Sequence, residues 1–386
     1  MTATRNPLTA LVALGQSVWL DFIRRDELSP TGRIARLIAE DDLRGVTSNP
    51  SIFEKAIDGS SAYDADIRAL GREARSTSEI LEALILKDVA LAADLFRPVY
   101  DATGGRDGFV SIEVSPKLAL DPSRSMAEAP RLWRALSHPN VMVKLPGTSA
   151  AVPAIRQLLA EGVNVNITLL FSVERYLEVH EAYLAALEER IREGQPVDRL
   201  SSVASFFVSR IDTALDPALE EIAKAGGPEA EKARGLAGTI AIANAKIAYQ
   251  KWRSIQESQR WVDLAGKGAR PQRLLWASTS TKNPAYSDVM YVEPLIGRET
   301  INTMPLETLE AYRTHGRPTL RLEEGLGEAQ RRLATLRELG LDLGKVTSQL
   351  ERDGVRKFVE PLDKVLASLE RKRAMMSASR QAPGVA

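Results

Sequence analysis

The sequence predicts an α/β fold, a (β/α)8 TIM barrel with extra helices, and two observations lead to it. Short runs rich in β-branched residues alternate with long amphipathic stretches of helical period, as in a parallel sheet flanked by helices. Several of these runs are apolar throughout instead of alternating, which indicates strands that are covered on both faces. Because eight such runs are present, a closed barrel is favoured over an open doubly wound sheet, which is the alternative.

The predicted strands are short and are separated mostly by helices. In chain order they cover residues 17–23, 45–48, 109–114, 141–145, 163–169, 202–208, 273–279 and 288–293. One helix is predicted over residues 148–162, with Thr148 or Ser149 as its N-cap and Gly162 at its end.

Two further helices follow from local patterns. Residues 172–194 carry apolar side chains at helical spacing, namely Tyr176, Val179, Tyr183, Leu187 and Ile191. Directly behind the second strand, Ser51 and Glu54 follow Pro50 with the spacing of a capping box, which predicts a helix start there.

The length of 386 residues fits one barrel domain with insertions, because barrels of this kind run from about 250 to more than 400 residues. We expect a single domain over residues 1–370. The longest gaps between strands, at 209–272 and after 297, predict a helical insertion at about 213–270 and additional C-terminal helices. The segment 371–386 is polar and rich in small residues, so a disordered tail is expected.

Charge and composition exclude several classes of partner. The 51 Lys and Arg residues balance the 51 Asp and Glu residues, so no basic field favours nucleic acid or an anionic membrane. No apolar stretch reaches the length of about 18 residues that a membrane helix needs. We therefore expect a cytoplasmic protein, a monomer or a homodimer, with no nucleic-acid or membrane partner.

Metal and cofactor sites are not expected. The chain has no Cys, which excludes disulfides, thiolate zinc sites and thiol nucleophiles. Its three His residues, His138, His180 and His315, are scattered and show no spacing of metal ligands.

Lys144 is the most informative residue, because it lies inside the apolar run Val141–Leu145. Desolvation disfavours an ammonium and leaves a larger fraction of free amine, which is the nucleophile that Schiff-base chemistry on a carbonyl needs. The alternative is a Lys on an exposed strand face, with its stem packed and its charge in water.

Asp21 and Glu113 are carboxylates inside similar apolar runs. Burial raises the pKa of such a group toward neutrality, which suits a group that accepts and returns protons. An ion pair with a neighbouring Lys or Arg is the alternative for each. Near a Schiff-base lysine the two interpretations merge, since the same carboxylates would tune that lysine.

Neutral hydrogen-bonding side chains lie on or after the second and fifth strands. Asn49, Asn166 and Thr168 are suited to orienting polyol hydroxyls or holding a water molecule. Turn formation and strand-end capping are the alternatives, and Asn49-Pro50 alone would be ordinary turn chemistry.

Two late segments predict a phosphate site, because the last strands and loops of such barrels commonly bind phosphate. Ser205 and Arg210 lie on or after the sixth strand, and the seventh strand ends in hydroxyls and a cation from Ser278 to Lys282. Hydroxyls, backbone N–H groups and cations together bind anions. A solvated loop is the alternative for either segment alone.

Six ordered segments between about residues 15 and 320 resemble the transaldolase family in its longer bacterial form. They are GVTSNPSIFEKAI, VMVKLPGT, GVNVNITLLFS, SFFVSRID, WASTSTKNPAYSD and INTMPLETLEAY. The resemblance implies a class I aldolase-like barrel that uses no cofactor or metal. It also implies transfer of a dihydroxyacetone unit between sugar phosphates, in the non-oxidative pentose phosphate pathway.

The resemblance implies roles for the catalytic residues. Lys144 corresponds to the Schiff-base lysine, Asp21 to the acid/base on the cleaved sugar's hydroxyl, and Glu113 to a carboxylate acting through a water molecule. Asn49, Asn166 and Thr168 correspond to positions that hold the donor's hydroxyls and that water.

For the phosphate, the resemblance implies that Ser205 and Arg210 are ligands. The chain departs from shorter transaldolases, which carry an Arg soon after the serine that Ser278 matches. Lys282 is expected to take its place.

Two other functions remain open at this point. A related fructose-6-phosphate aldolase would release free dihydroxyacetone, because water intercepts the enamine. A non-catalytic sugar-phosphate-binding barrel would not require Lys144, Asp21 and Glu113 together, so their joint presence argues against it.

Overall fold

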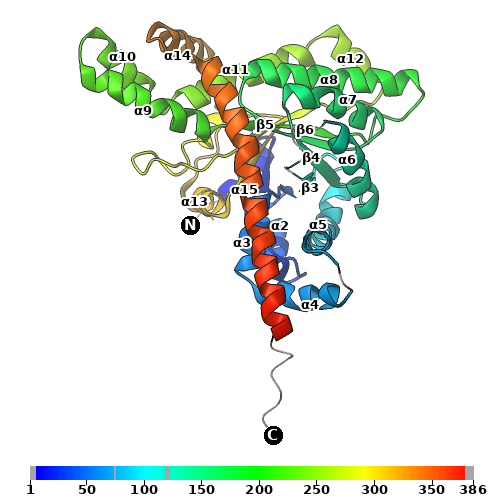
Figure 1. Ribbon diagram of the computed structural model, residues 1–386. Coiled ribbons are helices and arrows are strands. Elements are labelled where there is room, and N and C mark those ends of the chain that lie inside the picture. Colours follow the sequence, from blue (N-terminus) through cyan, green and yellow to red (C-terminus); the bar gives the residue numbers. More distant parts are fainter. Residues whose placement is uncertain (1–5, 74, 116, 118–121, 379–386) are drawn as a thin grey trace, which may run out of the picture.

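The computed structural model describes residues 6–73, 75–115, 117 and 122–378. Eight parallel strands form a closed barrel in sequence order, and β1 completes the ring by pairing with β8. Figure 1 shows helices packed around this barrel. The predicted (β/α)8 fold with extra helices is confirmed.

The strands are short, as the sequence predicted. They are β1 (Gln16–Leu20), β2 (Gly45–Val46), β3 (Phe109–Glu113), β4 (Val141–Pro146), β5 (Val165–Leu170), β6 (Ser202–Phe207), β7 (Arg273–Ala277) and β8 (Thr300–Met304). Every residue of these strands is buried except two, Glu113 at the end of β3 and Arg273 at the start of β7, which are half-buried.

The predicted eighth strand, at 288–293, is wrong. These residues form turns that lead into the 3-10 helix η5 (Glu293–Leu295), and the strand lies at Thr300–Met304. The connection buries Val289, Tyr291 and Val292. The apolar pattern of this segment therefore results from its burial and does not indicate a strand. The observed strand contains threonines and an asparagine, so its sequence is too polar to indicate that it is buried.

Helices cover the outside of the barrel. Up to β6 they are α1 (Pro7–Ala13), η1 (Arg25–Glu27), α2 (Arg33–Asp41), α3 (Pro50–Asp58), η2 (Ser61–Tyr63), α4 (Asp64–Arg72), α5 (Thr77–Ala102), α6 (Pro122–Leu136), η4 (Ser149–Ala151), α7 (Val152–Ala160) and α8 (Val173–Arg192). After β6 come α9 (Ser209–Ala225), α10 (Pro228–Leu236), α11 (Ile240–Gln256), α12 (Gln259–Gly266), α13 (Leu306–His315), α14 (Leu326–Glu338) and α15 (Leu343–Ala378).

The predicted capping box at Ser51 and Glu54 is wrong. Helix α3 begins two residues earlier, with Asn49 as its N-cap, and the Asn49 side chain accepts a hydrogen bond from the Ile52 N–H at 3.1 Å. Pro50 takes the first helical position, where its missing N–H is not needed. A stronger N-cap therefore displaces the predicted one, and it fixes Asn49 at the end of β2.

The two other predicted helices have nearly the expected bounds. The stretch 148–162 begins with the 3-10 turn η4, whose N-cap is Thr148, and continues as α7 before Gly162, which has a φ of +89°. Helix α8 begins behind Ser172, whose hydroxyl accepts a hydrogen bond from the Arg175 N–H at 3.1 Å.

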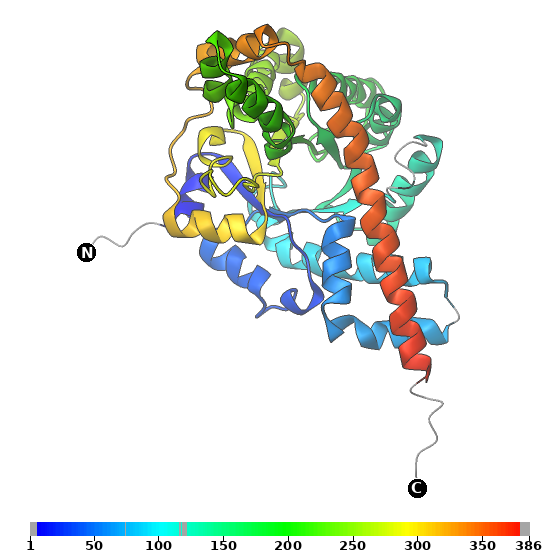
Figure 2. The ribbon, with the colours of Figure 1, turned by 60° about the vertical axis from the view of Figure 1, so that its left-hand side comes forward.

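Helix α15 crosses the molecule. It packs on α3, α4 and α5 near its end and on α9 and β5 near its start, and Figures 1 and 2 show it lying along one side of the barrel. The tail expected from residue 371 is wrong in its first part, because α15 continues to Ala378. Lys372 holds this end by donating to the Ser60 carbonyl at 3.0 Å. Residues 379–386, the rest of the expected tail, lie outside the described residues.

Four helices, α9 to α12, lie between β6 and β7, in the region where the sequence predicts an insertion. Figure 1 shows α9 and α10 projecting to one side of the barrel, beside α14. Among the described residues, no helix combines the length and the hydropathy needed to cross a membrane.

Candidate active site

A cavity of about 200 Å³ opens at the carboxyl ends of the strands, where barrels of this kind carry their reactive groups. Eight of the ten predicted site residues line it, and Glu113 and Asn166 do not. The lining residues are Asp21, Thr47, Asn49, Lys144, Thr168, Ser205, Phe207, Arg210, Ala277, Ser278, Ser280, Lys282, Thr303, Pro305 and Phe358.

Lys144 lies on β4 and its side chain is buried, with only 6% of it exposed. Its Nζ is 3.3 Å from Oε2 of Glu113 and donates a hydrogen bond to the Ser48 carbonyl at 3.2 Å. The alternative of a lysine on an exposed strand face is therefore wrong. Because the amine also borders the cavity, a carbonyl compound there would meet it directly.

Glu113 ends β3 and is paired in register with Lys144 on β4. Burial raises the pKa of its carboxyl, and the positive charge of Lys144 opposes that rise. The side chain of Glu113 is 7% exposed and does not line the cavity. Both interpretations of this carboxylate therefore apply, because it pairs with Lys144 while burial raises the pKa of its carboxyl.

Asp21 directly follows β1 and lines the cavity. Burial raises the pKa of its carboxyl, while Lys144 and the hydrogen bond from Thr47 oppose the rise. The Thr47 hydroxyl donates to Oδ1 of Asp21 at 2.7 Å, and the amide of Asn49 lies 3.5 Å from the same oxygen. These two contacts hold the carboxylate at the wall of the cavity that Lys144 also lines.

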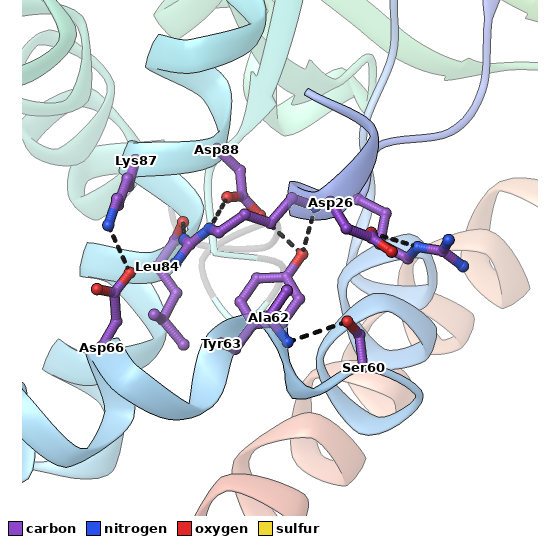
Figure 3. Close-up of polar contacts among 10 residues, drawn as sticks. Asp26, Ser60, Ala62, Tyr63, Asp66, Leu84, Lys87 and Asp88 are labelled. Atoms are coloured by element: carbon purple, nitrogen blue, oxygen red, sulfur yellow. Dashed lines mark hydrogen bonds and ion pairs between the residues drawn. The ribbon is translucent and has the colours of Figure 1, made fainter. Parts of the chain in front are cut away.

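The segment behind Asp21 is anchored by a buried polar cluster. Arg25 donates to Asp88 of α5 at 2.6 Å and lies over the ring of Tyr63, with its Cζ 4.6 Å from the ring centroid. The Tyr63 hydroxyl donates to Asp88 at 2.9 Å and accepts from the Arg25 N–H at 3.1 Å; Figure 3 shows Tyr63 pointing at Asp88. The chain is thus fixed four residues beyond Asp21 to a helix of the barrel wall.

The three polar residues on β5 and β6 divide into two groups. The Asn166 amide donates to the Ser111 hydroxyl at 2.9 Å and accepts from the Ser205 hydroxyl at 2.7 Å, so it forms a network between strands and does not line the cavity. The hydroxyl oxygen of Thr168 is buried at the cavity wall with no hydrogen-bond partner among the described residues. It is available to a ligand or a water molecule.

A second group of residues forms the opposite side of the cavity. Arg210 lies in the first turn of α9, with its Cζ 4.9 Å from the centroid of the Phe207 ring, and burial lowers the pKa of its guanidinium. Ser278 has a φ of +56°, a strained value for a residue other than glycine. Lys282 is exposed and donates to the Ser280 hydroxyl at 2.7 Å. The predicted phosphate residues are therefore brought together.

Helix α15 covers the mouth of the cavity with Phe358, whose ring centroid lies 5.6 Å from Nζ of Lys144. One turn earlier, Gly354 meets Leu169, and a Cβ at Gly354 would come within 2.8 Å of the Leu169 Cδ2. Leu169 has a φ of +61° at an irregularity in β5, next to Thr168. The absent side chain at Gly354 thus lets α15 approach the barrel and place Phe358 over the lysine.

Sequence reasoning missed several lining residues, among them Thr47, Phe207, Thr303 and Phe358. Thr47 could have been found, because it precedes Ser48 and Asn49 at the end of β2. Thr303 was missed because the eighth strand was placed too early. Among the described residues, no group of three or more His, Asp or Glu side chains is arranged to hold a metal ion.

Comparison with known proteins agrees with this geometry. The sequence profile of the family described as Transaldolase/Fructose-6-phosphate aldolase matches residues 18–369. A protein named Transaldolase from Acidothermus cellulolyticus is 47% identical over 375 residues, which cover 95% of this chain and 98% of that protein. Transaldolase from Trichodesmium erythraeum is 45% identical over 371 residues, 95% of this chain and 97% of the relative.

Transaldolase from Thiobacillus denitrificans is 46% identical over 356 residues, which cover 92% of this chain and 97% of that protein. The profile match covers nearly the whole barrel, from β1 to α15, and includes every residue that lines the cavity. The chain belongs to the transaldolase/fructose-6-phosphate aldolase family.

Proposed function

We propose that the protein is a transaldolase of the non-oxidative pentose phosphate pathway. It transfers a dihydroxyacetone unit from sedoheptulose 7-phosphate or fructose 6-phosphate to glyceraldehyde 3-phosphate or erythrose 4-phosphate. The observation that carries this proposal is the buried Lys144 at the wall of a cavity that also holds Asp21 and Arg210. The names and coverage of the relatives support the same activity.

The first step is formation of a Schiff base. The Lys144 amine adds to the ketone carbonyl of the donor sugar, and the carbinolamine loses water to give a protonated imine. Glu113, at 3.3 Å from Nζ, takes the amine's proton and returns it to the departing hydroxyl through a water molecule. The free hydroxyl of Thr168 is placed to hold that water at the cavity wall.

The second step breaks the bond between the third and fourth carbons of the sugar. Asp21 accepts the proton of the hydroxyl on the fourth carbon, an aldose phosphate leaves, and the bonding electrons enter the imine to form an enamine. Burial raises the pKa of the Asp21 carboxyl, and a carboxylate with a raised pKa accepts a proton more readily, which suits this work. The imine is the electron sink, so the step needs no metal ion.

Transfer reverses these steps. The enamine carbon attacks the aldehyde of the acceptor sugar phosphate, Asp21 returns its proton to the new hydroxyl, and water hydrolyses the imine. Arg210 and Lys282 hold the phosphate of donor and acceptor alternately, with Ser278 contributing its hydroxyl. Phe358 over Lys144 limits access of water to the waiting enamine, which favours transfer over release of free dihydroxyacetone.

Reductive trapping tests the proposal. Borohydride treatment in the presence of fructose 6-phosphate should add the mass of a reduced dihydroxyacetone unit to the peptide that contains Lys144. Lys246 is an internal control, because burial lowers the pKa of its amine, but this amine donates to the carbonyls of Arg321 and Glu324, outside the cavity. An adduct at Lys246, or no adduct in the wild type, would contradict the mechanism.

The same reaction separates transfer from simple cleavage. With fructose 6-phosphate and erythrose 4-phosphate together, the products should be sedoheptulose 7-phosphate and glyceraldehyde 3-phosphate. Accumulation of free dihydroxyacetone at the same rate with and without the acceptor would identify an aldolase instead.

A further inference from the structure

The connection between β7 and β8 is unusual for a (β/α)8 barrel, because residues 278–299 contain no α-helix and only the short η5. It nevertheless supplies Ser278, Ser280 and Lys282 to the cavity. A long irregular connection has many accessible conformations, so contacts elsewhere must hold it if it carries ligand-binding groups.

Two buried carboxylates of α9 hold this connection. Asp216 accepts a hydrogen bond from the Tyr286 hydroxyl at 2.9 Å, and Asp212 accepts one from the Tyr291 hydroxyl at 3.1 Å. The other oxygen of each carboxylate accepts a backbone N–H, for Asp216 from Gly238 in the turn between α10 and α11 at 2.9 Å and for Asp212 from Ala241 in the first turn of α11 at 2.8 Å. We call the pairs Asp212–Tyr291 and Asp216–Tyr286 the Asp–Tyr anchor.

The turn between α10 and α11 is also shaped to receive the connection. Gly238 has a φ of +68°, and a Cβ there would lie 2.7 Å from Cζ of Tyr286 and 2.9 Å from the Cε of Met290. Any side chain at Gly238 would thus displace the tyrosine ring from Asp216. The helical insertion between β6 and β7 therefore contacts the connection through hydrogen bonds and through close packing at Gly238.

The anchor is not an efficient way to stabilise a fold. Asp212 and Asp216 are 1% and 7% exposed, and no Lys or Arg pairs with either within the described part of the chain. Buried charges without a cation cost free energy, and apolar residues of similar volume would stabilise such a contact at least as well. What the carboxylates add is a defined position for both tyrosines.

We propose that the Asp–Tyr anchor positions Lys282 at the phosphate end of the cavity. Helix α9 then serves both cations, since it carries Arg210 in its first turn and holds the segment of Lys282 through the two tyrosines. The inference rests on the proposed function, because it assumes that this end of the cavity binds the phosphate of the sugar. The anchor residues touch no substrate and act through Lys282.

The test removes one hydroxyl at a time. Tyr286→Phe and Tyr291→Phe should each raise the KM for fructose 6-phosphate by about 2- to 10-fold, the value of one net hydrogen bond. The reason is that apparent affinity falls with the fraction of molecules whose loop is in the binding position. The kcat at saturation, and the rate with free fructose, should change little, because Lys144 and Asp21 are untouched.

Tyr312→Phe is the matched control. The Tyr312 hydroxyl is buried in α13 and has no hydrogen-bond partner among the described residues, so its loss should leave the KM unchanged. Asp216→Asn should recover part of the affinity that Asp216→Ala loses, because the asparagine amide can still bond to Gly238 and Tyr286. Hydrogen exchange over residues 279–292 should rise in the Tyr→Phe variants and not in the control.

The outcomes separate the two proposals. If the wild type forms no adduct at Lys144, the proposed function fails and this inference fails with it. If all variants form the adduct but the KM for fructose 6-phosphate is unchanged in Tyr286→Phe and Tyr291→Phe, the function stands and the anchor is overturned. Equal losses with fructose 6-phosphate and free fructose would show a general folding role, which also overturns it.

Discussion

The two ends of the cavity are built in different ways. The end that we propose to form the Schiff base, here called the Schiff-base end, contains Lys144, Glu113 and Asp21. The first two lie on strands and Asp21 directly follows one, and an ion pair and a hydrogen bond to neighbouring segments hold them. The end that we propose to bind phosphate, here called the phosphate end, contains Arg210, Ser278 and Lys282, which lie at the start of a helix and in an irregular connection. Its lysine is exposed, whereas Lys144 is buried.

The difference follows from what each end has to do. Bond making requires the reacting atoms to be held within a fraction of an ångström, and a misplacement of about 1 Å can reduce the rate 10²-fold. A cation attracts a phosphate over a broader range of positions, so a looser support is sufficient. In the proposed function, the barrel itself supplies the chemistry, and the insertion and the β7–β8 connection supply the recognition of the phosphate.

The largest effect is expected from a substitution at the Schiff-base end that leaves the phosphate end unchanged. Asp21→Asn keeps the size of the side chain but cannot accept the hydroxyl proton, so the turnover rate should fall by about 10²- to 10⁴-fold. The imine forms before Asp21 is needed, so borohydride should still trap fructose 6-phosphate on Lys144. The control is Asp26→Asn, an exposed carboxylate in the same connection, which should leave turnover unchanged. Near-normal turnover of Asp21→Asn would remove Asp21 from its assigned role.

A smaller effect is expected at the phosphate end. Charge-assisted hydrogen bonds contribute about 1.5–3 kcal/mol, so Lys282→Ala and Arg210→Ala should each raise the KM for phosphorylated sugars by roughly 10- to 150-fold. Lys282 should lie near the lower limit because it is exposed, and Arg210 near the upper limit because burial strengthens its interaction with an anion.

Free fructose, which leaves the phosphate end empty, should be affected much less by either substitution. Lys224→Ala removes an exposed lysine of the same helix as Arg210. It should change neither the KM for phosphorylated sugars nor the KM for free fructose. No change in Lys282→Ala would mean that Arg210 binds the phosphate alone and that Lys282 is a solvated charge.

The two ends also differ in how far the sequence predicts them. A charge inside an apolar strand is a strong signal, and Lys144, Asp21 and Glu113 all carry it. The order of the strands then brings the three together, because parallel strands end at the same face of a barrel. The Schiff-base end could thus be assembled from local patterns and the fold class alone.

The phosphate end depends on contacts between distant segments. Tyr291 lies in an apolar run that resembles a strand, and only the packing against α9 shows that it belongs to an irregular connection. Phe358 is an apolar residue in a long amphipathic helix, and such a residue has the same pattern whether it faces a core or a cavity. Its place over Lys144 follows from the path of α15, which no local pattern specifies.

The last prediction concerns the Asp–Tyr anchor, whose substitution is expected to change the pH dependence of stability and not turnover. Burial is the main cause that raises the pKa of the Asp212 carboxyl from 3.8 to about 7, and the nearby Asp216 adds to it, while the N–H of Ala241 and the hydroxyl of Tyr291 oppose it. Between about pH 4 and pH 7, the folded protein therefore binds a proton at Asp212 more tightly than the unfolded chain does. The contribution of Asp212 to the free energy of unfolding is therefore complete below about pH 4 and is lost as the pH rises through about 7, by at most roughly 1.4 kcal/mol per pH unit.

Asp212→Asn removes the titrating group and keeps a side chain that can bond to Ala241 and Tyr291. Relative to the wild type, the variant should thus gain stability as the pH rises from about 4 to about 7, and the difference should be constant at higher pH. Urea unfolding at several pH values measures it, and the subtraction cancels all groups that titrate alike in both proteins. Asp198→Asn, at an exposed carboxylate, should give a flat difference. If the difference in the free energy of unfolding between Asp212→Asn and the wild type also does not change with pH, Asp212 is ionised over the whole range. The Asp–Tyr anchor would then carry a permanent negative charge.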